Sequence, residues 1–278
     1  MQLRAPAKIN LSFKILGRRA NGFHEIETLM APISLADELT ISRTPTTGEI
    51  DFVCNDPSLP AGADNLVVRA ARLFLTTTNL STGVRIELRK NIPHGAGLGG
   101  GSSDAASTLL GLNEMLGAGL AETKLAELAA EIGSDVPFFI FRSAAECRGR
   151  GEIVTPITLP GAMSLLLMKP AFGVPTPWAY SRWQDSRELP GVDYRAQDFA
   201  GLNFVNDLER PVFEKYVFLA QLKMWLLAQA EVGAAILSGS GSTVLAVLRD
   251  GADATALAAR AKAELDPELW TCACAIRA

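Results

Sequence analysis

Residues 93–104 have the sequence Pro93-His94-Gly95-Ala96-Gly97-Leu98-Gly99-Gly100-Gly101-Ser102-Ser103-Asp104, and glycine fills five of these twelve positions. Before this segment, Val84 to Leu88 alternates apolar and polar residues, which is the period of a half-buried strand. After it, apolar residues recur at helical spacing between Ala105 and Leu116. The sequence therefore predicts a strand, a glycine loop and a helix in succession.

A glycine loop between a strand and a helix is suited to hold an anion. Glycine lets backbone N–H groups approach a phosphate closely, and the helix start adds unpaired N–H donors and the positive end of its dipole. Ser102 and Ser103 lie where a hydroxyl could cap the helix, contact a phosphate oxygen or bind Mg²⁺. The alternative is an ordinary loop with a capping Ser or Asp, but so many glycines are costly without a ligand.

Three kinds of nucleotide loop can be compared with this segment. Gly95 to Gly100 formally satisfies the dinucleotide pattern G-x-G-x-x-G, yet no strand ending in Asp or Glu follows at the distance needed to hold a ribose. A Walker A loop requires a lysine after its glycines, and this segment has none. A protein-kinase loop requires H-R-D and D-F-G partners, which the sequence lacks. None of the three patterns fits well.

Composition excludes several classes of protein. The chain has 278 residues, of which 48% are hydrophobic and 20% charged, with a formal net charge of −4. This composition predicts a folded protein with a substantial core and not a disordered one. Apolar runs such as Met163 to Met168 are far shorter than the roughly 20 residues of a membrane helix. Because there is no basic excess or basic stripe, we expect no nucleic-acid partner.

Histidine and cysteine usage excludes further chemistry. The two histidines, His24 and His94, lack the spacing of zinc ligands, and no G-x-S-x-G elbow of a serine hydrolase is present. The four cysteines have no CxxC spacing, and the first residues carry charge where a signal peptide would be apolar. We therefore expect free thiols and a cytoplasmic location. Cys272 and Cys274 alternate on a predicted strand, so both thiols should point to one face.

Strand and helix patterns mix along the chain without strict alternation, which favours an α+β fold. Strand patterns occur at 9–15, 84–88, 234–237 and 244–248, and helical patterns at 66–74, 105–116, 121–132, 217–229 and 254–265. Asn21-Gly22 is a turn signal, Asp64 can cap the helix after it, and Gly133 can end another. The proline-rich region 156–177 is predicted to be extended and to cross into a second domain.

The glycine loop has the pattern P-x-G-x-G-L-G-x-G-S-S, and two further motifs accompany it: Ala5-Pro6-Ala7-Lys8-Ile9-Asn10 and Leu237-Ser238-Gly239-Ser240-Gly241-Ser242-Thr243. In this order they resemble the three motifs of the GHMP kinases (galacto-, homoserine, mevalonate and phosphomevalonate kinases). The resemblance implies ATP and Mg²⁺, a nucleotide-binding domain over 1–157 and a ferredoxin-like α/β domain over 158–278. It also implies an active site in the cleft between them.

Two more segments indicate a branch of that family. Gly17 to Leu29 resembles the signature of the branch that phosphorylates the 2-hydroxyl of 4-diphosphocytidyl-2-C-methyl-D-erythritol, in the non-mevalonate isoprenoid pathway. Asp64 to Ala71 is similar to that branch as well, and Gly133 to Phe139 resembles the segment that carries its catalytic aspartate. By this resemblance Asp135 accepts or orients the proton of the attacking hydroxyl, and Lys8 keeps Asp135 ionised. From the residues alone, Asp135 could equally be a helix N-cap.

The same resemblance implies the remaining site residues. Asn10 and His24 would contact the edge of the cytosine, and Phe23 and Tyr180 would sandwich its ring, as aromatic side chains stack on bases elsewhere. The nucleotide would contact Asn65, Lys90, Pro93, His94, Gly95, Ala96, Gly97, Leu98, Gly99, Gly100, Gly101, Ser102 and Ser103. Gly239, Ser240 and Gly241 would form the loop beside the phosphates, and no metal ligand is assigned.

Other functions remain open at this point. A kinase of homoserine or mevalonate would share the glycine motifs but would not need the Phe23-His24 pair. A catalytically inactive regulatory protein would have no reason to keep Lys8, Asp135 and Ser103 together. A dinucleotide oxidoreductase would bind NAD and not ATP. For the kinase that the resemblance implies, we expect ATP and the cytidine compound as small-molecule substrates, no nucleic acid, no membrane contact and a monomer or homodimer.

Overall fold

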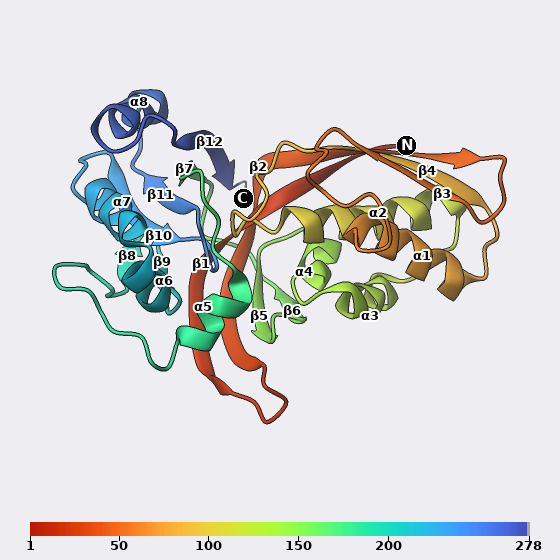
Figure 1. Cartoon of the computed structure of the whole chain (residues 1–278), viewed down its shortest axis with the longest axis horizontal. Helices are drawn as coiled ribbons and strands as arrows, with labels where there is room; N and C mark the ends of the chain where they lie inside the picture. Colours follow the sequence, from red (N-terminus) through yellow and green to blue (C-terminus); the bar gives the residue numbers. More distant parts are fainter. Residues whose placement is uncertain (277–278) are drawn as a thin grey trace.

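Two long antiparallel strands form the spine of the molecule. The computed structural model describes residues 1–276, and Figure 1 shows β1 (Gln2–Arg18) and β2 (His24–Thr44) running side by side through most of its length. Their connection holds the predicted Asn21-Gly22 turn. The pairing shifts register between Pro6 and Lys8, and such a bulge re-aims the side chains that follow it.

The first sheet has the order β3-β4-β2-β1-β9-β8, and β5 pairs with β2 and with β6. Its further strands are β3 (Ile50–Cys54), β4 (Gly83–Arg89), β5 (Ala145–Gly149), β6 (Ile153–Pro156), β8 (Gln197–Phe199) and β9 (Leu202–Asn206). Helices α1 (Leu66–Thr78), α2 (Gly100–Leu116), α3 (Glu122–Ile132) and α4 (Val136–Phe141) lie on one side of its long strands (Figure 1). The strand, glycine loop and helix predicted around residues 93–104 are β4, the loop and α2.

The second sheet is antiparallel, in the order β10-β11-β7-β12. Its strands are β7 (Met163–Lys169), β10 (Val232–Leu237), β11 (Val244–Leu248) and β12 (Trp270–Ile276). Between β7 and β10 come α5 (Thr176–Arg182), α6 (Glu209–Lys215) and α7 (Val217–Leu227), and α8 (Ala254–Glu264) precedes β12. This succession and strand order are those of a ferredoxin-like βαββαβ unit, which confirms the α+β prediction. The region 156–177, predicted to be extended, contains the central strand β7.

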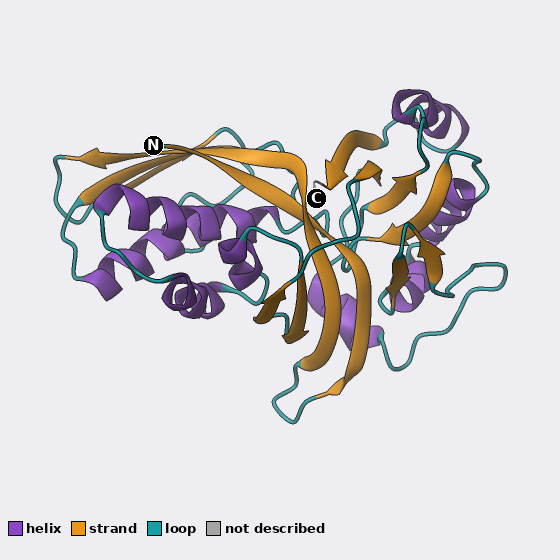
Figure 2. Ribbon diagram, turned by 180° about the vertical axis from the view of Figure 1, so that it is seen from behind, coloured by secondary structure: helices purple, strands orange, loops and turns teal. Residues whose placement is uncertain are grey.

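The two halves of the chain share the first sheet and core residues. β9, which follows residue 157, pairs in parallel with β1 through Ser12↔Val205 and Phe13↔Asn206. One buried cluster joins Ile9 and Leu11 of β1 to Leu165 of β7, and Figure 2 shows both long strands passing into the second half. The division of the chain at 157/158 stays a prediction.

Two helix starts differ from their predictions. The N-cap of α1 is Asn65, whose Oδ1 accepts a hydrogen bond from the N–H of Val67 at 2.9 Å, and not Asp64. The N-cap of α2 is Gly99, whose φ of 68° turns the chain directly into the helix. Ser102 and Ser103 therefore lie inside the first turn and do not cap it.

The thiols follow their prediction. All four cysteines are free, and Cys272 and Cys274 are both partly buried on β12 against one core cluster. Among residues 1–276, no helix is long and apolar enough to cross a bilayer.

Candidate active site

The glycine loop is packed too tightly to accept side chains. Gly97 and Gly99 have φ of 75° and 68°, which L-residues with a side chain rarely adopt. A Cβ on Gly97 would lie 2.2 Å from the carbonyl oxygen of Ser238, and one on Gly99 would lie 2.9 Å from Cγ of Lys8. The loop therefore needs glycine in order to approach both the third motif and the first strand.

The start of α2 presents free donors to the cavity. Its first intrahelical bond runs from the N–H of Ser103 to the carbonyl of Gly99 at 2.9 Å, so the N–H groups of Gly100, Gly101 and Ser102 have no partner within the helix. These three residues line a cavity of about 420 Å³. Three backbone donors at the positive end of a 17-residue helix make an anion-binding site.

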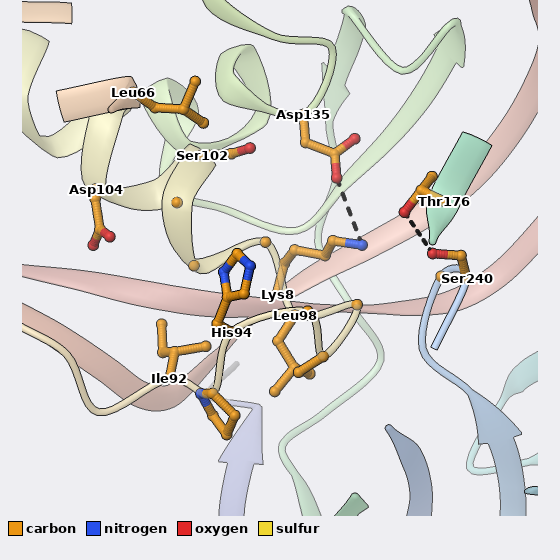
Figure 3. Close-up of a pocket in the computed structure, with 18 of the residues that line it drawn as sticks. Lys8, Leu66, Ile92, His94, Leu98, Ser102, Asp104, Asp135, Thr176 and Ser240 are labelled. Atoms are coloured by element: carbon orange, nitrogen blue, oxygen red, sulfur yellow. Dashed lines mark hydrogen bonds and ion pairs between the residues drawn. The ribbon is translucent and has the colours of Figure 1, made fainter. Parts of the chain in front are cut away.

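The two serines of the loop differ in position. Ser102 lines the cavity, and Figure 3 shows its hydroxyl on the side that faces Asp135. Ser103 is fully buried, and its Oγ has no hydrogen-bond partner among the described residues. The structure thus brings Ser102, but not Ser103, to the cavity wall.

Lys8 and Asp135 face each other across this cavity (Figure 3). Nζ of Lys8 lies 3.7 Å from Oδ2 of Asp135 and donates a hydrogen bond to Oδ1 of Asn10 at 2.6 Å. Lys8 is 4% exposed, whereas the Asp135 side chain is 36% exposed. Asp135 holds the N-cap position of α4 but makes no capping hydrogen bond. Its carboxylate is therefore free to meet a ligand.

Asn10 is held on both sides of its amide. Its Oδ1 accepts from Lys8, and its Nδ2 donates to Oγ1 of Thr28 at 2.8 Å. Asn10 lines the glycine-loop cavity together with Lys8 and Tyr180. In the free protein, Asn10 therefore positions the ammonium of Lys8.

A second cavity, of about 480 Å³, adjoins the first. Phe23, His24 and Tyr180 line it, and the rings of His24 and Tyr180 have centroids 5.2 Å apart with planes tilted by 31°. Phe23 is 51% exposed, with the guanidinium of Arg150 5.0 Å above its ring. The predicted pair Phe23 and Tyr180 thus shares one cavity with His24, but Asn10 does not line it.

Burial shifts the pKa values of two side chains in this second cavity. It lowers the pKa of His24, and the positive charge of Arg18 lowers it further. Burial also raises the pKa of the Tyr180 hydroxyl, with a further contribution from the carboxylate of Asp135. Both side chains are therefore neutral at neutral pH and can offer hydrogen bonds without charge.

Three residues line both cavities: Asp135, Thr176 and Tyr180. The Thr176 hydroxyl lies 2.7 Å from the Ser240 hydroxyl, a contact that ties α5 to the third motif (Figure 3). A group in one cavity can therefore meet a group in the other at the Asp135 carboxylate.

The third motif closes the phosphate side of the site. A Cβ on Gly239, which has a φ of 56°, would lie 3.4 Å from Nζ of Lys8. Gly239 and Ser240 line the first cavity, whereas Gly241 does not. Asn206 holds this loop by donating from Nδ2 to the carbonyls of Leu237 at 2.7 Å and Gly239 at 2.8 Å.

Lys90 and Asn65 line the cavity, but their polar side-chain atoms already bind other groups of the protein. The Lys90 ammonium pairs with Asp37 and, at 2.7 Å, with Asp104. Burial alone lowers the pKa of Lys90, but the two carboxylates outweigh it and raise the pKa. Asn65 caps α1 and donates to the carbonyl of Pro60 at 2.8 Å. The remaining predicted nucleotide residues, Pro93, His94, Gly95, Ala96 and Leu98, also line the cavity.

Sequence reasoning missed several residues that line these cavities or hold a loop of their walls. Thr176 and Asn206 carry no local signal, because their contacts lie 64 residues away for Thr176 and about 30 for Asn206. Arg150 stands between two glycines directly after β5, a cationic side chain on a tight turn, and that signal could have singled it out. Arg18, at the end of β1, lies within the signature segment Gly17 to Leu29, and that position could have identified it.

Comparison with known proteins bears on the family. The family description "GHMP kinases N terminal domain" matches residues 65–143. The 4-diphosphocytidyl-2-C-methyl-D-erythritol kinase of Methylacidiphilum infernorum is 43% identical over 269 residues, covering 96% of this chain and 93% of that protein. The protein of the same name from Geobacter metallireducens is 40% identical, with 88% of each chain covered.

Solved structures agree with the sequence relatives. The crystal structure of a 4-(cytidine 5'-diphospho)-2C-methyl-D-erythritol kinase is 35% identical and superposes with a TM-score of 0.79 over 100% of both chains. A homoserine kinase from Cytophaga hutchinsonii, at 17% identity and a TM-score of 0.70, shares the fold alone. The chain therefore belongs to the 4-diphosphocytidyl-2-C-methyl-D-erythritol kinase family of the GHMP kinases, phosphotransferases that act on an alcohol.

Proposed function

We propose that the chain transfers the γ-phosphoryl group of ATP to the 2-hydroxyl of 4-diphosphocytidyl-2-C-methyl-D-erythritol, giving the 2-phosphate and ADP. The observation that carries this proposal is the position of Asp135, whose carboxylate lines both the glycine-loop cavity and the cavity of Phe23, His24 and Tyr180. ATP occupies the first cavity and the cytidine compound the second. The relatives that cover most of the chain are named for this acceptor.

In the proposed reaction, phosphoryl transfer depends on position and charge more than on covalent chemistry. The free N–H groups of Gly100, Gly101 and Ser102 hold the phosphates of ATP. The 2-hydroxyl oxygen bonds to the γ-phosphorus as the bond from that phosphorus to the leaving ADP oxygen breaks. The hydroxyl proton passes to Asp135, or Asp135 orients the hydroxyl during the same step.

Lys8 acts on the same atoms from the opposite side. With Nζ 3.7 Å from Oδ2 of Asp135, its charge keeps the carboxylate ionised and offsets the negative charge of the transferred group. Asn10 holds the ammonium in this place by accepting its hydrogen bond, and Gly239 leaves room for it, since a Cβ there would lie 3.4 Å from Nζ. Asn65 and Lys90 border the adenine as parts of the cavity frame.

Mg²⁺ fits the donors that this cavity offers. In phosphoryl-transfer sites the ion takes one or two protein oxygens in addition to phosphate oxygens, and Ser102 and Asp135 supply such oxygens on one cavity. When bound, the ion neutralises charge on the β- and γ-phosphates.

The cytidine end of the acceptor lies between Phe23 and Tyr180. Stacking on aromatic faces is worth about 1–3 kcal/mol per base, and neutral His24 meets the polar edge of the ring. Asn10 lies outside this cavity and stays with the ammonium of Lys8. Arg18 and Arg150 bring positive charge to this cavity, which suits an acceptor that carries a diphosphate. We place the enzyme in the cytoplasm, because its four thiols are free. We expect a monomer or homodimer.

The test is phosphate transfer from ATP in the presence of Mg²⁺, with the cytidine compound offered beside homoserine and mevalonate. We expect turnover of the cytidine compound alone. Turnover of homoserine or mevalonate would keep the kinase but reject the acceptor. ATP binding without any turnover would favour a regulatory protein with an inactive site.

A further inference from the structure

A cavity of about 750 Å³ lies at the junction of the two sheets, apart from the active site. Its walls come from the start of β1, the C-terminal end of α4, parts of β2 and α2, and the last residues of β12. Figures 1 and 2 both show β12 beside β2 at this junction. None of the residues that line this junction cavity lines either cavity of the active site.

The junction cavity is positively charged. Arg4 and Arg142 line it, and none of the described residues in its wall is acidic. Both arginine side chains are exposed, and neither guanidinium forms an ion pair within residues 1–276. Arg4 donates only to the carbonyl of Ser34, at 3.0 Å. A described wall with two arginines and no acidic residue favours an anionic ligand.

A buried hydroxyl stands beside the second of these arginines. Oγ of Ser143 is inaccessible to water and has no hydrogen-bond partner among the described residues, which is uncommon for a buried polar atom. Arg142 itself has a φ of 53°, a conformation that side-chain-bearing residues seldom adopt. Both residues line the junction cavity, but Oγ of Ser143 is closed to water, so the turn offers the cavity the guanidinium of Arg142.

The remaining wall is largely apolar. Leu3, Ile33, Leu110, Phe139 and Ile276 all line the junction cavity. A volume of this size is typical of small-molecule sites, in which apolar walls supply affinity and a few polar groups fix orientation. We propose that the junction cavity binds a small amphipathic anion: an apolar carbon chain that ends in a phosphate or a carboxylate.

Phe139 connects such a ligand to the active site. Its ring lines the junction cavity, and a Cβ on Gly99 would lie 3.0 Å from Cζ of this ring and 2.9 Å from Cγ of Lys8. Phe139 is 4% exposed and belongs to α4, the helix that begins directly after Asp135. A ligand against Phe139 therefore presses on the side chain that supports the glycine loop, and we expect it to change the KM for ATP.

The test is calorimetric titration of the full chain with octyl phosphate below its micellar concentration, beside octanoate, octanol and inorganic phosphate. We expect octyl phosphate or octanoate to bind at least about tenfold more tightly than octanol or inorganic phosphate, because both parts of the cavity must be used. Tighter binding of octyl phosphate would identify the headgroup as a phosphate, and tighter binding of octanoate would identify it as a carboxylate. The double variant Arg4→Gln, Arg142→Gln should weaken binding at least about tenfold, since each good charge pair contributes that much.

Matched variants keep the result interpretable. Arg187→Gln removes an exposed arginine outside these cavities and should leave binding unchanged. If the double variant does not fold, Leu110→Trp, which fills the cavity from α2, should abolish binding instead. Octanol binding as tightly as the anions, or binding that survives these variants, would overturn the site. Full competition with ATP would do so as well, because the coupling allows only a limited change in affinity.

The coupling has its own readout. Saturating octyl phosphate should shift the KM for ATP at least about twofold in the wild type and in Arg187→Gln, but not in the double variant. Binding without any shift would overturn the coupling through Phe139. The KM readout rests on the proposed function, because it needs turnover of an acceptor. Calorimetry needs no acceptor, so the binding outcomes are independent of that function.

Discussion

Asp135 shows why a single position can be ambiguous in a sequence and clear in a structure. It occupies the N-cap position of α4, where an aspartate often accepts a backbone hydrogen bond, yet its side chain makes none. The carboxylate lies 3.7 Å from Nζ of Lys8 and lines two cavities. A side chain that leaves a helix uncapped in this way is available to a ligand.

The first prediction concerns this carboxylate. Asp135→Asn should lower kcat by about 10²–10⁴-fold, the usual contribution of a general acid or base, because the amide cannot take a proton. The KM for ATP should stay within about twofold, since the donors of the glycine loop are untouched. Steady-state kinetics measure both quantities, with the exposed Asp250→Asn as a control. A parallel rise in the KM for ATP would mean that Asp135 chiefly shapes the nucleotide cavity.

A second prediction at this scale is the pH dependence of His24. Burial and then Arg18 lower its pKa below the ordinary value of 6.5, so the neutral form is favoured in the folded protein. Its contribution to stability is present above that ordinary value and is lost as pH falls through the lowered pKa. The KM for the cytidine acceptor should therefore be constant above about pH 6.5 and rise below it, as the imidazole gains a proton beside Arg18.

The same pH series includes its control. His24→Gln should raise the KM for the acceptor at every pH and flatten its rise at low pH, while the KM for ATP keeps one profile in both proteins. A wild-type KM that falls on acidification would show that the imidazolium is the binding form.

At the scale of elements, the sequence predicts helices and strands from local patterns, but it does not predict contacts between residues far apart in the chain. Alternation from Ile9 to Ile15 predicts β1, and the glycine loop predicts both its neighbours, because each signal lies within a few residues. The start of α2 was placed too late, since the left-handed Gly99 replaces a side-chain cap. The Lys90–Asp37 pair joins residues 53 apart, and no local pattern marks Asp37 as its partner. Contacts of this kind arise only from the packed fold.

The network of Lys90 gives a prediction at this scale. Burial raises the pKa of Asp104 to about 8 even though Lys90 opposes the shift. A carboxyl with a raised pKa adds stability that is complete below its ordinary value and is lost as pH rises toward the folded value. The free energy of unfolding should therefore fall as pH rises from about 4 to about 8, and Asp104→Asn should reduce this slope.

Urea unfolding at each pH measures that slope. Asp250→Asn, which removes an exposed carboxylate, should keep the wild-type pH dependence. The prediction fails if Asp104→Asn and the wild type lose stability in parallel, because the proton would then be bound elsewhere in the network.

At the scale of the whole molecule, the two sheets do not form separate cores. β9 is hydrogen-bonded to β1, and Phe13 and Ile15 of β1 belong to a buried cluster with Leu166 and Leu222 of the second half. The active site also combines residues of both halves, since Lys8 comes from β1 and Gly239 from the loop after β10. A separation of the two halves would therefore expose apolar surface and take apart the site.

The last prediction follows from this sharing: the chain should unfold in urea in one transition, although it has two sheets. The four tryptophans, Trp178, Trp183, Trp225 and Trp270, all lie in the second half, so their emission reports that half. Cys147 is fully buried in β5, and burial raises the pKa of its thiol to about 12, so thiol labelling of a variant with Cys54, Cys272 and Cys274 replaced by Ser reports the first sheet. The two midpoints should coincide. Cys147 protected at urea concentrations where the emission has already changed would mean that the first sheet holds without β9, and that the junction contributes to catalysis more than to folding.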